Sequence, residues 1–305
     1  MMDREHLPVL LEEVIGALMV SPHGAYVDGT FGRGGHSTRI LEALSPQGSL
    51  MALDHDPAAA ESASQLAQHD QRFSFKAANF RALSQHVELG SLQGVLLDLG
   101  VSSPQLDDPE RGFSFSHDGP LDMRMNPDEG RSAAEWLAEA PASEIATVLR
   151  ELGEERFARR IANAIVAARS EQPLQRTGQL AEVVSAANPK WEKHKHPATR
   201  SFQAIRLHVN GELDALRDAL EAILLALAPG GRMVVISFHS LEDRIVKRFI
   251  RAAVRGPQLP PGVPIRHAEY PGLVRQIGKA VMPTPAEVSQ NPRARSAVMR
   301  IAERL

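Results

Sequence analysis

Cysteine is absent from this sequence of 305 residues. That absence excludes disulfide bonds, thiolate metal sites and thiol nucleophiles. Long apolar segments are also missing, because the longest wholly apolar run covers only residues 222–228, whereas a membrane-spanning helix needs roughly 20 such residues. The charged residues at positions 3–5 do not fit a signal peptide. We therefore expect a cytoplasmic protein that has no membrane partner.

The chain also lacks a strong excess of one charge. Its formal net charge of −3 gives no global signature of nucleic-acid binding, so a nucleic-acid partner would have to be met by a local basic patch. Neither internal repeats nor low-complexity tracts are present. The hydrophobic content of 43% is ordinary for a globular protein that forms one large core or two smaller ones.

Short apolar segments that alternate with helical patterns predict an α/β fold. Strands are predicted at residues 26–27, 50–53, 73–77, 95–97 and 233–236, with two short strands near 273–277 and 297–301. Helices are predicted after the first and second strands, and this alternation favours a doubly wound, mostly parallel, seven-stranded sheet. Ligands of such sheets bind beyond the carboxyl ends of the strands.

Residues 26–41 read as a short strand, a glycine-rich turn and the start of a helix, an arrangement that directs free backbone N–H groups at a ligand. Asp28, Asp54 and Asp98 each follow an apolar strand, so the predicted fold places three carboxylates at one edge of the sheet. Asp54 lies 20 residues after Gly34, where an acid can accept hydrogen bonds from ribose hydroxyls. Helix capping or solvated loops would also explain any one of these acids.

A nicotinamide-binding protein would share this fold, but its fingerprint begins with glycine directly after the first strand. Here the strand ends in Asp28, and the glycines follow at positions 32, 34 and 35. This acid-first loop resembles that of class I S-adenosylmethionine methyltransferases. The segment LAPGGR at 227–232 likewise resembles the turn that precedes the fifth strand in that superfamily.

The segment between the fourth and fifth strands is much longer than one crossover helix. We expect residues 105–200 to form an inserted, mainly helical domain for RNA recognition, and residues 1–104 and 201–305 to form the cofactor-binding domain. Within the insertion, 105–130 reads as a lid loop and 133–168 and 180–187 as helical. One long amphipathic helix is predicted over 201–227, and a capping box from Ser240 to Asp243 begins the next helix.

The densest basic cluster lies at residues 190–200 and includes Trp191. Basic side chains beside an indole suit phosphates and an unstacked base, which favours RNA contacts by Lys193, Lys195 and Arg200. Solvated loop charges are the alternative. His194 and His196 have a spacing that metal ligands can show, but no acid or thiol accompanies them in the pattern of a metal site, so no metal is expected.

Several motifs together resemble the bacterial 16S rRNA cytosine-N4 methyltransferase family. They are DGTFGRGGHS at 28–37, DLGVSSPQLD at 98–107, GFSF at 112–115, GPLDMRM at 119–125, HPATR at 196–200, SFHSLEDR at 237–244 and NPRARS at 291–296. The resemblance extends over nearly the whole chain. It implies transfer of a methyl group from S-adenosylmethionine to the exocyclic N4 amine of a cytidine in the decoding region of 16S rRNA.

The resemblance also implies a set of cofactor contacts: Gly34, Gly35, His36, Asp54, Phe80, Asp98 and Gln105. In that assignment Asp54 takes the ribose hydroxyls and Phe80 lies against adenine. Asp98 and Gln105 line the adenine or the methionine end, and the glycines let the backbone approach the methionine moiety.

The residues present agree with a nitrogen acceptor. Methylation of pyrimidine carbon 5 proceeds through a thiolate adduct, which a chain without cysteine cannot form. Ribose methylation usually involves a Lys-Asp-Lys-Glu set, and no lysine lies near the first strand or directly after the fifth. We hypothesise that Ser102 or Ser103 accepts the amine hydrogens and that Asp98 supports proton loss after transfer.

The target base would have to leave its stack to be methylated. Methylation of another RNA base amine and a non-catalytic role in ribosome assembly remain alternatives. The sequence leaves open whether free rRNA or the small ribosomal subunit is the partner, and whether the protein forms a homodimer.

Overall fold

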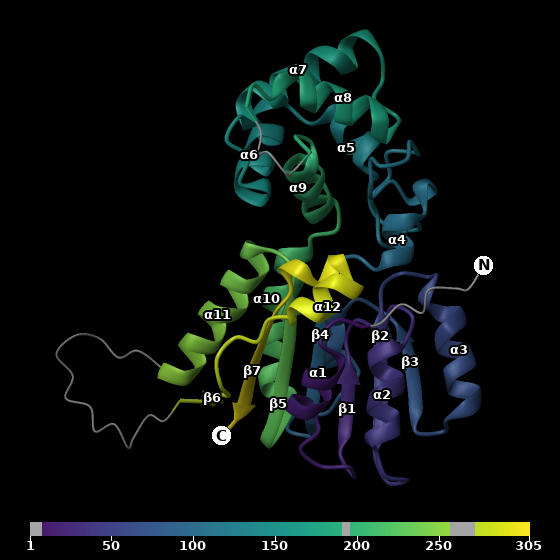
Figure 1. Ribbon diagram of the computed structural model, residues 1–305, viewed down its shortest axis with the longest axis vertical. Coiled ribbons are helices and arrows are strands. Elements are labelled where there is room, and N and C mark those ends of the chain that lie inside the picture. The colour runs from purple at the N-terminus through teal and green to yellow at the C-terminus, as the bar shows by residue number, and fades with distance from the viewer. Residues whose placement is uncertain (1–7, 191–195, 257–271) are drawn as a thin grey trace, which may run out of the picture. The chain divides into compact units, whose positions relative to one another are not determined.

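The computed structural model describes residues 8–190, 196–256 and 272–305, and its elements are drawn in Figure 1. The chain forms two compact units: unit 1 comprises Met1–Gly100 and Leu213–Leu305, and unit 2 comprises Val101–Glu212. The sequence led us to expect domain boundaries between residues 104 and 105 and between residues 200 and 201. Within the described ranges, no helix has the length and apolar character needed to cross a membrane.

Unit 1 contains a seven-stranded sheet with the order β3-β2-β1-β4-β5-β7-β6. The first five strands along the chain pair in parallel, whereas β7 runs antiparallel to both β5 and β6. The bounds are Ala25–Asp28, Ser49–Asp54, Phe73–Ala77, Leu92–Asp98, Leu227–Ser237, Val274–Gln276 and Val298–Arg304 for β1 to β7. The predicted doubly wound, mostly parallel sheet is thereby confirmed.

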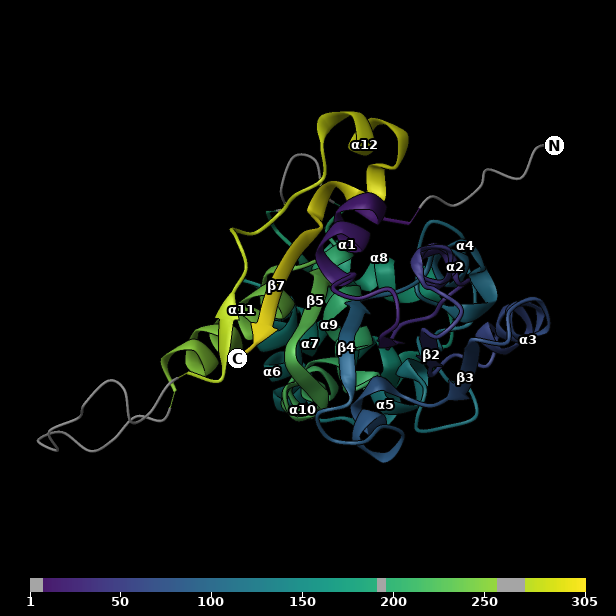
Figure 2. The same cartoon turned by 90° about the horizontal axis from the view of Figure 1, so that it is seen from below.

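The sheet is covered by helices on both faces, because successive residues of a strand point to opposite sides. Leu96 of β4 packs with residues of α1, α2 and α3, and Leu97 packs with residues of α10 and α11. Figure 2 shows the sheet between α1 and α10. The helices of unit 1 are α1 (Leu11–Leu18), α2 (Gly35–Ala43), α3 (Ala59–His69), α10 (Glu212–Ala226), α11 (Ser240–Arg255) and α12 (Pro285–Gln290), with the 3₁₀ helices η1 (Phe80–Gln85) and η3 (Pro292–Ser296).

Unit 2 is helical and has its own core. Trp136, Ile145, Leu149, Ile161 and Phe202 are among the buried side chains that pack together there. Its helices are α4 (Ser103–Asp107), α5 (Ala133–Glu139), α6 (Ala142–Gly153), α7 (Ala158–Glu171), α8 (Thr177–Ala187) and α9 (Thr199–Val209), with the 3₁₀ helix η2 (Pro109–Arg111).

The prediction of one long helix over 201–227 is wrong, because α9 ends at Val209 and α10 begins at Glu212. Gly211 between them has a φ of 59°, which a right-handed helix cannot contain and glycine adopts readily. The apolar spacing continues across this break, so periodicity alone conceals it.

The predicted capping box is misplaced by one residue. His239, not Ser240, is the N-cap of α11, and its ring accepts a hydrogen bond from the N–H of Glu242. The Glu242 carboxylate accepts in return from the N–H of His239 at 3.3 Å. Histidine is not among the residues normally expected at this position.

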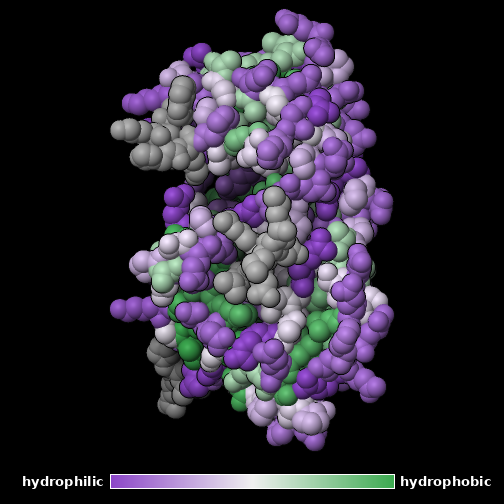
Figure 3. Space-filling model, turned by 45° about the vertical axis from the view of Figure 1, so that its right-hand side comes forward, coloured by the Kyte–Doolittle hydropathy of each residue, from purple (hydrophilic) through white to green (hydrophobic). Residues whose placement is uncertain are grey.

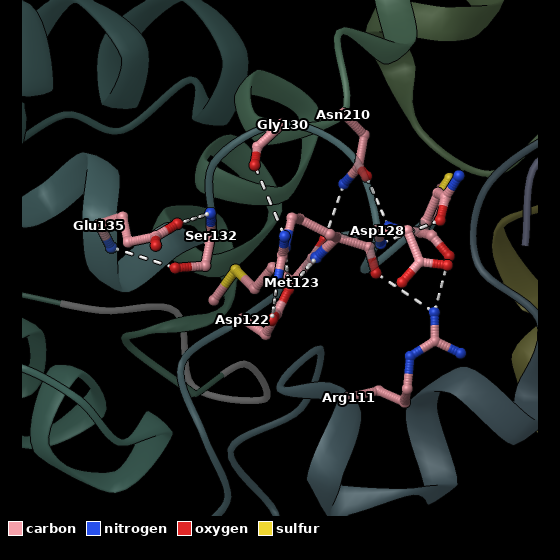
Figure 4. Close-up of polar contacts among 11 residues, drawn as sticks. Arg111, Asp122, Met123, Asp128, Gly130, Ser132, Glu135 and Asn210 are labelled. Carbon is pink, nitrogen blue, oxygen red and sulfur yellow. Dashed lines mark hydrogen bonds and ion pairs between the residues drawn. The ribbon is translucent and has the colours of Figure 1, made fainter.

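The segment 105–130, expected to be a lid, packs within unit 2. Phe113, Leu121 and Met123 are buried in the core of that unit. Figure 4 shows how the segment is held: the Arg111 guanidinium donates to the carbonyl oxygen of Met125 at 2.8 Å, and the Asn210 amide donates to that of Met123 at 2.8 Å. Met123 has a φ of 64°, a strained conformation that such surrounding contacts have to maintain.

The surface view in Figure 3 shows a face that is mostly hydrophilic and broken by smaller hydrophobic areas. Large apolar side chains do reach the surface in the described part of the chain, such as Leu89 and Met282. Exposed apolar residues of this kind are common on soluble proteins and do not by themselves mark a site.

Candidate functional site

The glycine-rich loop between β1 and α2 is fastened by Asp28, the last residue of β1. Its carboxylate accepts a hydrogen bond from the hydroxyl of Ser37 in α2 at 2.7 Å and another from the N–H of Thr30 at 3.1 Å. Asp28 is only 1% exposed, and burial raises the pKa of its carboxyl. Asp28 therefore stabilises the loop by binding both the loop and the start of α2.

Two glycines in the loop have backbone conformations that other residues rarely adopt. Gly32 has a φ of 57° and Gly34 a φ of 81°. A Cβ at Gly34 would lie 2.8 Å from the ring of Phe31, so the position lacks both the conformation and the space for a side chain. Helix α2 begins at the next residue, and no side chain caps its N-terminus. Such a helix start favours anionic groups.

Asp54 ends β2 and supports the same loop. One carboxylate oxygen accepts a hydrogen bond from the N–H of Gly32 at 2.7 Å, and the other accepts from the N–H of Asp56 at 2.8 Å. Burial raises the pKa of the Asp54 carboxyl to about 6. Because an ionised carboxylate has about four acceptor positions, Asp54 can hold the loop and still accept bonds from ribose hydroxyls.

Asp98 ends β4 and faces His36, the second residue of α2. The Nδ1 atom of His36 lies 3.6 Å from an Asp98 carboxylate oxygen, and its Nε2 atom lies 3.0 Å from the carbonyl oxygen of Val9. Since a carbonyl can only accept, Nε2 must carry the proton, which leaves Nδ1 directed at Asp98.

The second carboxylate oxygen of Asp98 is buried and has no hydrogen-bond partner within the described residues. Burial raises the pKa of the Asp98 carboxyl to about 6; the His36 charge acts in the opposite direction, and the Asp28 and Glu242 charges add to the rise. Such an unsatisfied buried acceptor is costly and needs an explanation. A bound donor group would supply one.

Phe80, the first residue of η1, lies beside this loop. A Cβ at Gly29 would come within 3.3 Å of the Phe80 Cβ atom and 2.5 Å of Leu97. The Phe80 ring is half-buried against the core on the α10 and α11 side of the sheet. An aromatic face at this position is suited to stacking on a base.

Three predicted residues lie in unit 2, at the start of α4. The amide oxygen of Gln105 accepts a hydrogen bond from the N–H of Ser102 at 2.8 Å, which helps to cap the helix. Ser103 and Gln105 are buried. Their roles toward cofactor and substrate stay predictions. The local geometry accounts only for their part in capping the helix.

Of the predicted RNA contacts, Lys193 and Lys195 lie outside the described residues. Arg200 is on α9, and its guanidinium donates to the carbonyl oxygen of Glu154, just after α6, at 2.6 Å. Glu154 has a φ of 50°, so part of the Arg200 side chain serves to close that helix end.

Two residues of the motif at 237–244 lie near the same edge of the sheet. His239 comes two residues after β5, whose Ile236 pairs with Asp98 of β4, and Glu242 lies in the first turn of α11. The Glu242 carboxylate accepts from the N–H of Phe238 at 2.8 Å, and its other oxygen lies 3.1 Å from Nε2 of His239. Their position after a predicted strand could have marked them. The described residues contain no cluster of three potential metal ligands.

The sequence matches a known protein family over nearly its whole length. The model of the MraW methylase family matches residues 3–305. A protein of Thioalkalivibrio sulfidiphilus named ribosomal RNA small subunit methyltransferase H is 60% identical over 98% of this chain and 97% of that protein. A protein of the same name from Chromohalobacter salexigens is 58% identical over 99% of this chain and 92% of its own length.

Among solved structures, an rRNA methylase of Streptococcus thermophilus covers 96% of this chain and 93% of its own, with a TM-score of 0.43 and 11% identity. The family assignment depends on the sequence match, which covers nearly every residue, and not on that structural likeness. This chain belongs to the MraW methylase family.

Proposed function

We propose that this protein transfers the methyl group of S-adenosylmethionine to the exocyclic N4 amine of a cytidine in 16S rRNA. The observation that carries the proposal is the full-length match to a methylase family whose relatives are named as methyltransferases of small-subunit ribosomal RNA. The carboxylate-lined edge of the sheet supports the proposal. An rRNA substrate also favours a cytoplasmic location.

The proposed cofactor site lies across the carboxyl ends of β1, β2 and β4. Asp54 would accept the ribose hydroxyls and Phe80 would stack on adenine, while Gly34 and Gly35 leave room for the methionine end beside the start of α2. The unsatisfied oxygen of Asp98 fits a site that receives a donor from a ligand. When bound, S-adenosylmethionine supplies an electrophilic methyl group.

His36 and Gln105 complete the proposed cofactor contacts. The Nε2–H of His36 is committed to Val9, so His36 would act through Nδ1 and through its contact with Asp98. Gln105 would use its side-chain NH₂ group, because its oxygen accepts from Ser102.

The acceptor nitrogen is a weak nucleophile, since its lone pair is delocalised into the cytosine ring. Catalysis must therefore come mainly from positioning and from removal of the amine proton. Ser102 and Ser103, four and five residues after Asp98, would accept the amine hydrogens. Asp98 would take the proton, because a carboxyl with a pKa of about 6 is mostly ionised at neutral pH.

For RNA contact we propose Lys193, Lys195 and Arg200, within an insertion at 105–200 that recognises the substrate. Charge reversal of these three residues should weaken RNA binding and leave S-adenosylmethionine affinity unchanged. Loss of both affinities together would count against the assignment.

The function is tested by incubating the purified protein with labelled S-adenosylmethionine and unmodified small ribosomal subunits, or with free 16S rRNA, followed by nucleoside analysis. We expect label in N4-methylcytidine. Label in another nucleoside would mean that the methyl acceptor is a different base. Unlabelled RNA despite bound cofactor would favour a non-catalytic assembly factor. The two substrates distinguish free rRNA from the assembled subunit, and light scattering of the same sample tests for a homodimer.

A further inference from the structure

Helix α11 carries a basic face. Its members are exposed side chains spaced three or four residues apart: Arg244, Lys247, Arg248, Arg251 and Arg255. At 3.6 residues per turn these positions fall within about a third of the helix circumference. Val246, Ile250 and Ala253 on the other side are buried against the sheet.

No carboxylate shares this basic face. The two acids of α11, Glu242 and Asp243, are in its first turn. Glu242 is buried. Asp243 accepts two hydrogen bonds from Arg300 of β7, at 2.6 and 3.1 Å. Neither acid forms an ion pair with Lys247, Arg248, Arg251 or Arg255.

Several other exposed arginines of the chain have acidic partners. Six of them lie within ion-pair distance of a carboxylate, namely Arg81, Arg131, Arg150, Arg176, Arg217 and Arg275. Across the described ranges, no carboxylate forms an ion pair with Lys247, Arg248, Arg251 or Arg255. In a chain whose net charge is −3, α11 therefore carries a local excess of positive charge.

Helix stability does not explain the basic face. Like charges three or four residues apart destabilise a helix, and α11 has them at Arg244 and Arg248, and at Lys247 and Arg251. The helix dipole favours cations only in the last turn, which holds Arg255 alone. A function on the surface is the remaining reason for the pattern.

The position of α11 relates this face to the proposed site within unit 1. Only Phe238 and His239 separate the end of β5 from the start of α11, and β5 pairs with the end of β4 at Asp98. Figure 1 shows α11 beside β5, β6 and β7. The basic face therefore begins about one turn beyond the edge that carries Asp98, and it extends for about 16 Å at 1.5 Å per residue.

We propose that the basic face of α11 binds the phosphate backbone of the RNA substrate near the base to be methylated. The inference rests on the proposed function and adds a contact surface on the sheet-containing unit. A length of about 16 Å can meet several successive phosphates. Four of the five residues are arginines, whose forked guanidinium groups match phosphate oxygens. A membrane surface fits less well, because a helix at a bilayer must bury its apolar face there, and that face of α11 is already in the core.

The test compares Lys247→Gln/Arg251→Gln with the wild-type protein in binding to unmodified 16S rRNA transcript between 50 and 200 mM salt. Loss of two phosphate contacts to single-stranded RNA should reduce the slope of log affinity against log salt by about 1.4, so wild-type affinity falls about sevenfold more over this range. KM for RNA should rise while kcat at saturating RNA stays unchanged.

Arg81→Gln/Arg217→Gln is the matched control, because it removes the same charge from two exposed arginines that are paired with Asp218 and Asp214. Its salt slope should equal that of the wild type. Glutamine is a good helix former, and unchanged circular dichroism and S-adenosylmethionine affinity verify folding. If the double variant loses helix content, single substitutions carry the test, each lowering the slope by about 0.7.

The outcomes separate this inference from the proposed function. Wild-type protein that binds neither the transcript nor unmodified small ribosomal subunits overturns both. Wild-type binding with an unchanged slope in the α11 variant overturns the basic face alone. Equal RNA binding by both proteins, together with weaker binding of the variant to vesicles of anionic phospholipid, would assign the face to a membrane instead.

Discussion

Asp98 has the properties of a proton acceptor for the transfer step. Its buried oxygen has no partner within the described residues, and its pKa of about 6 keeps it mostly ionised at neutral pH. We predict that Asp98→Asn lowers kcat by about 10²- to 10⁴-fold, the usual contribution of a general base, when cofactor is saturating. Full turnover in this variant, measured by methyl transfer to rRNA, would show that Asp98 accepts no proton.

The same carboxyl predicts the pH dependence of activity. Protonated Asp98 cannot accept the amine proton, so the rate of the wild-type protein should fall as pH drops through about 6. Initial rates between pH 5 and 8, with both substrates saturating, check this. A flat profile over that range would contradict the role, provided that the fold is intact at each pH.

Burial of Asp98 also makes the stability of the folded protein depend on pH. A carboxyl whose pKa is raised on folding, from 3.8 to about 6, loses stabilisation as pH rises through that interval. Asp98→Asn should therefore increase the free energy of unfolding at pH 7 and have little effect near pH 4, as measured by urea denaturation. Asp118→Asn is the opposite control, because Arg176 lowers the pKa of Asp118, and that variant should be less stable at pH 7.

Gly34 can be tested against a glycine with similar strain and free space. Gly34→Ala and Gly90→Ala both place alanine at positive φ, 81° and 67°, which costs about 1–2 kcal/mol. Only at Gly34 does the new Cβ meet Phe31; at Gly90 nothing lies within 4 Å. Calorimetry should show lost S-adenosylmethionine affinity for Gly34→Ala and unchanged affinity for Gly90→Ala. Equal affinities would remove the loop from the cofactor site.

At the scale of elements, Asn210 links the end of α9 to the segment around Met123. Its side chain accepts from the N–H of Met125 at 2.7 Å and donates to the carbonyl oxygen of Met123. Asn210→Ala should lower the free energy of unfolding by about 1–3 kcal/mol, because partly buried polar groups lose their partners.

Asn126→Ala is a suitable control, since the Asn126 side chain accepts only one exposed bond, from the N–H of Asp128. Its effect should stay within about 0.5 kcal/mol. Equal destabilisation of the two variants in urea denaturation would mean that Asn210 does not hold the segment.

Strands β1, β2 and β4 could be predicted because each contains a short apolar run that ends in an aspartate. The predicted strand 73–77 coincides with β3, and Asp28, Asp54 and Asp98 do end β1, β2 and β4. The break at Gly211 was missed because the apolar pattern of α9 and α10 is continuous, although the dipeptide Asn210-Gly211 is a turn signal. The cap by His239 was missed since it depends on a ring nitrogen in place of a hydroxyl.

At the scale of the whole molecule, the sequence predicted the fold class and the family, which depend on patterns that are local in the chain. The hydrogen bonds that hold the site residues in place join segments that are distant in the chain, so they were not predictable. Asp54 holds the N–H of Gly32, and His36 connects Val9 with Asp98. The basic residues of α11 were visible in the sequence, but their exposure on one face of the helix required the structure.

We propose above that S-adenosylmethionine lies across the carboxyl ends of β1, β2 and β4. A crystal structure of the protein with S-adenosylmethionine tests it most directly. We expect the ribose hydroxyls on Asp54, adenine against Phe80 and the methionine end beside Gly34. Cofactor bound elsewhere, or a site at these strand ends that stays closed by side chains at saturating cofactor, would contradict it.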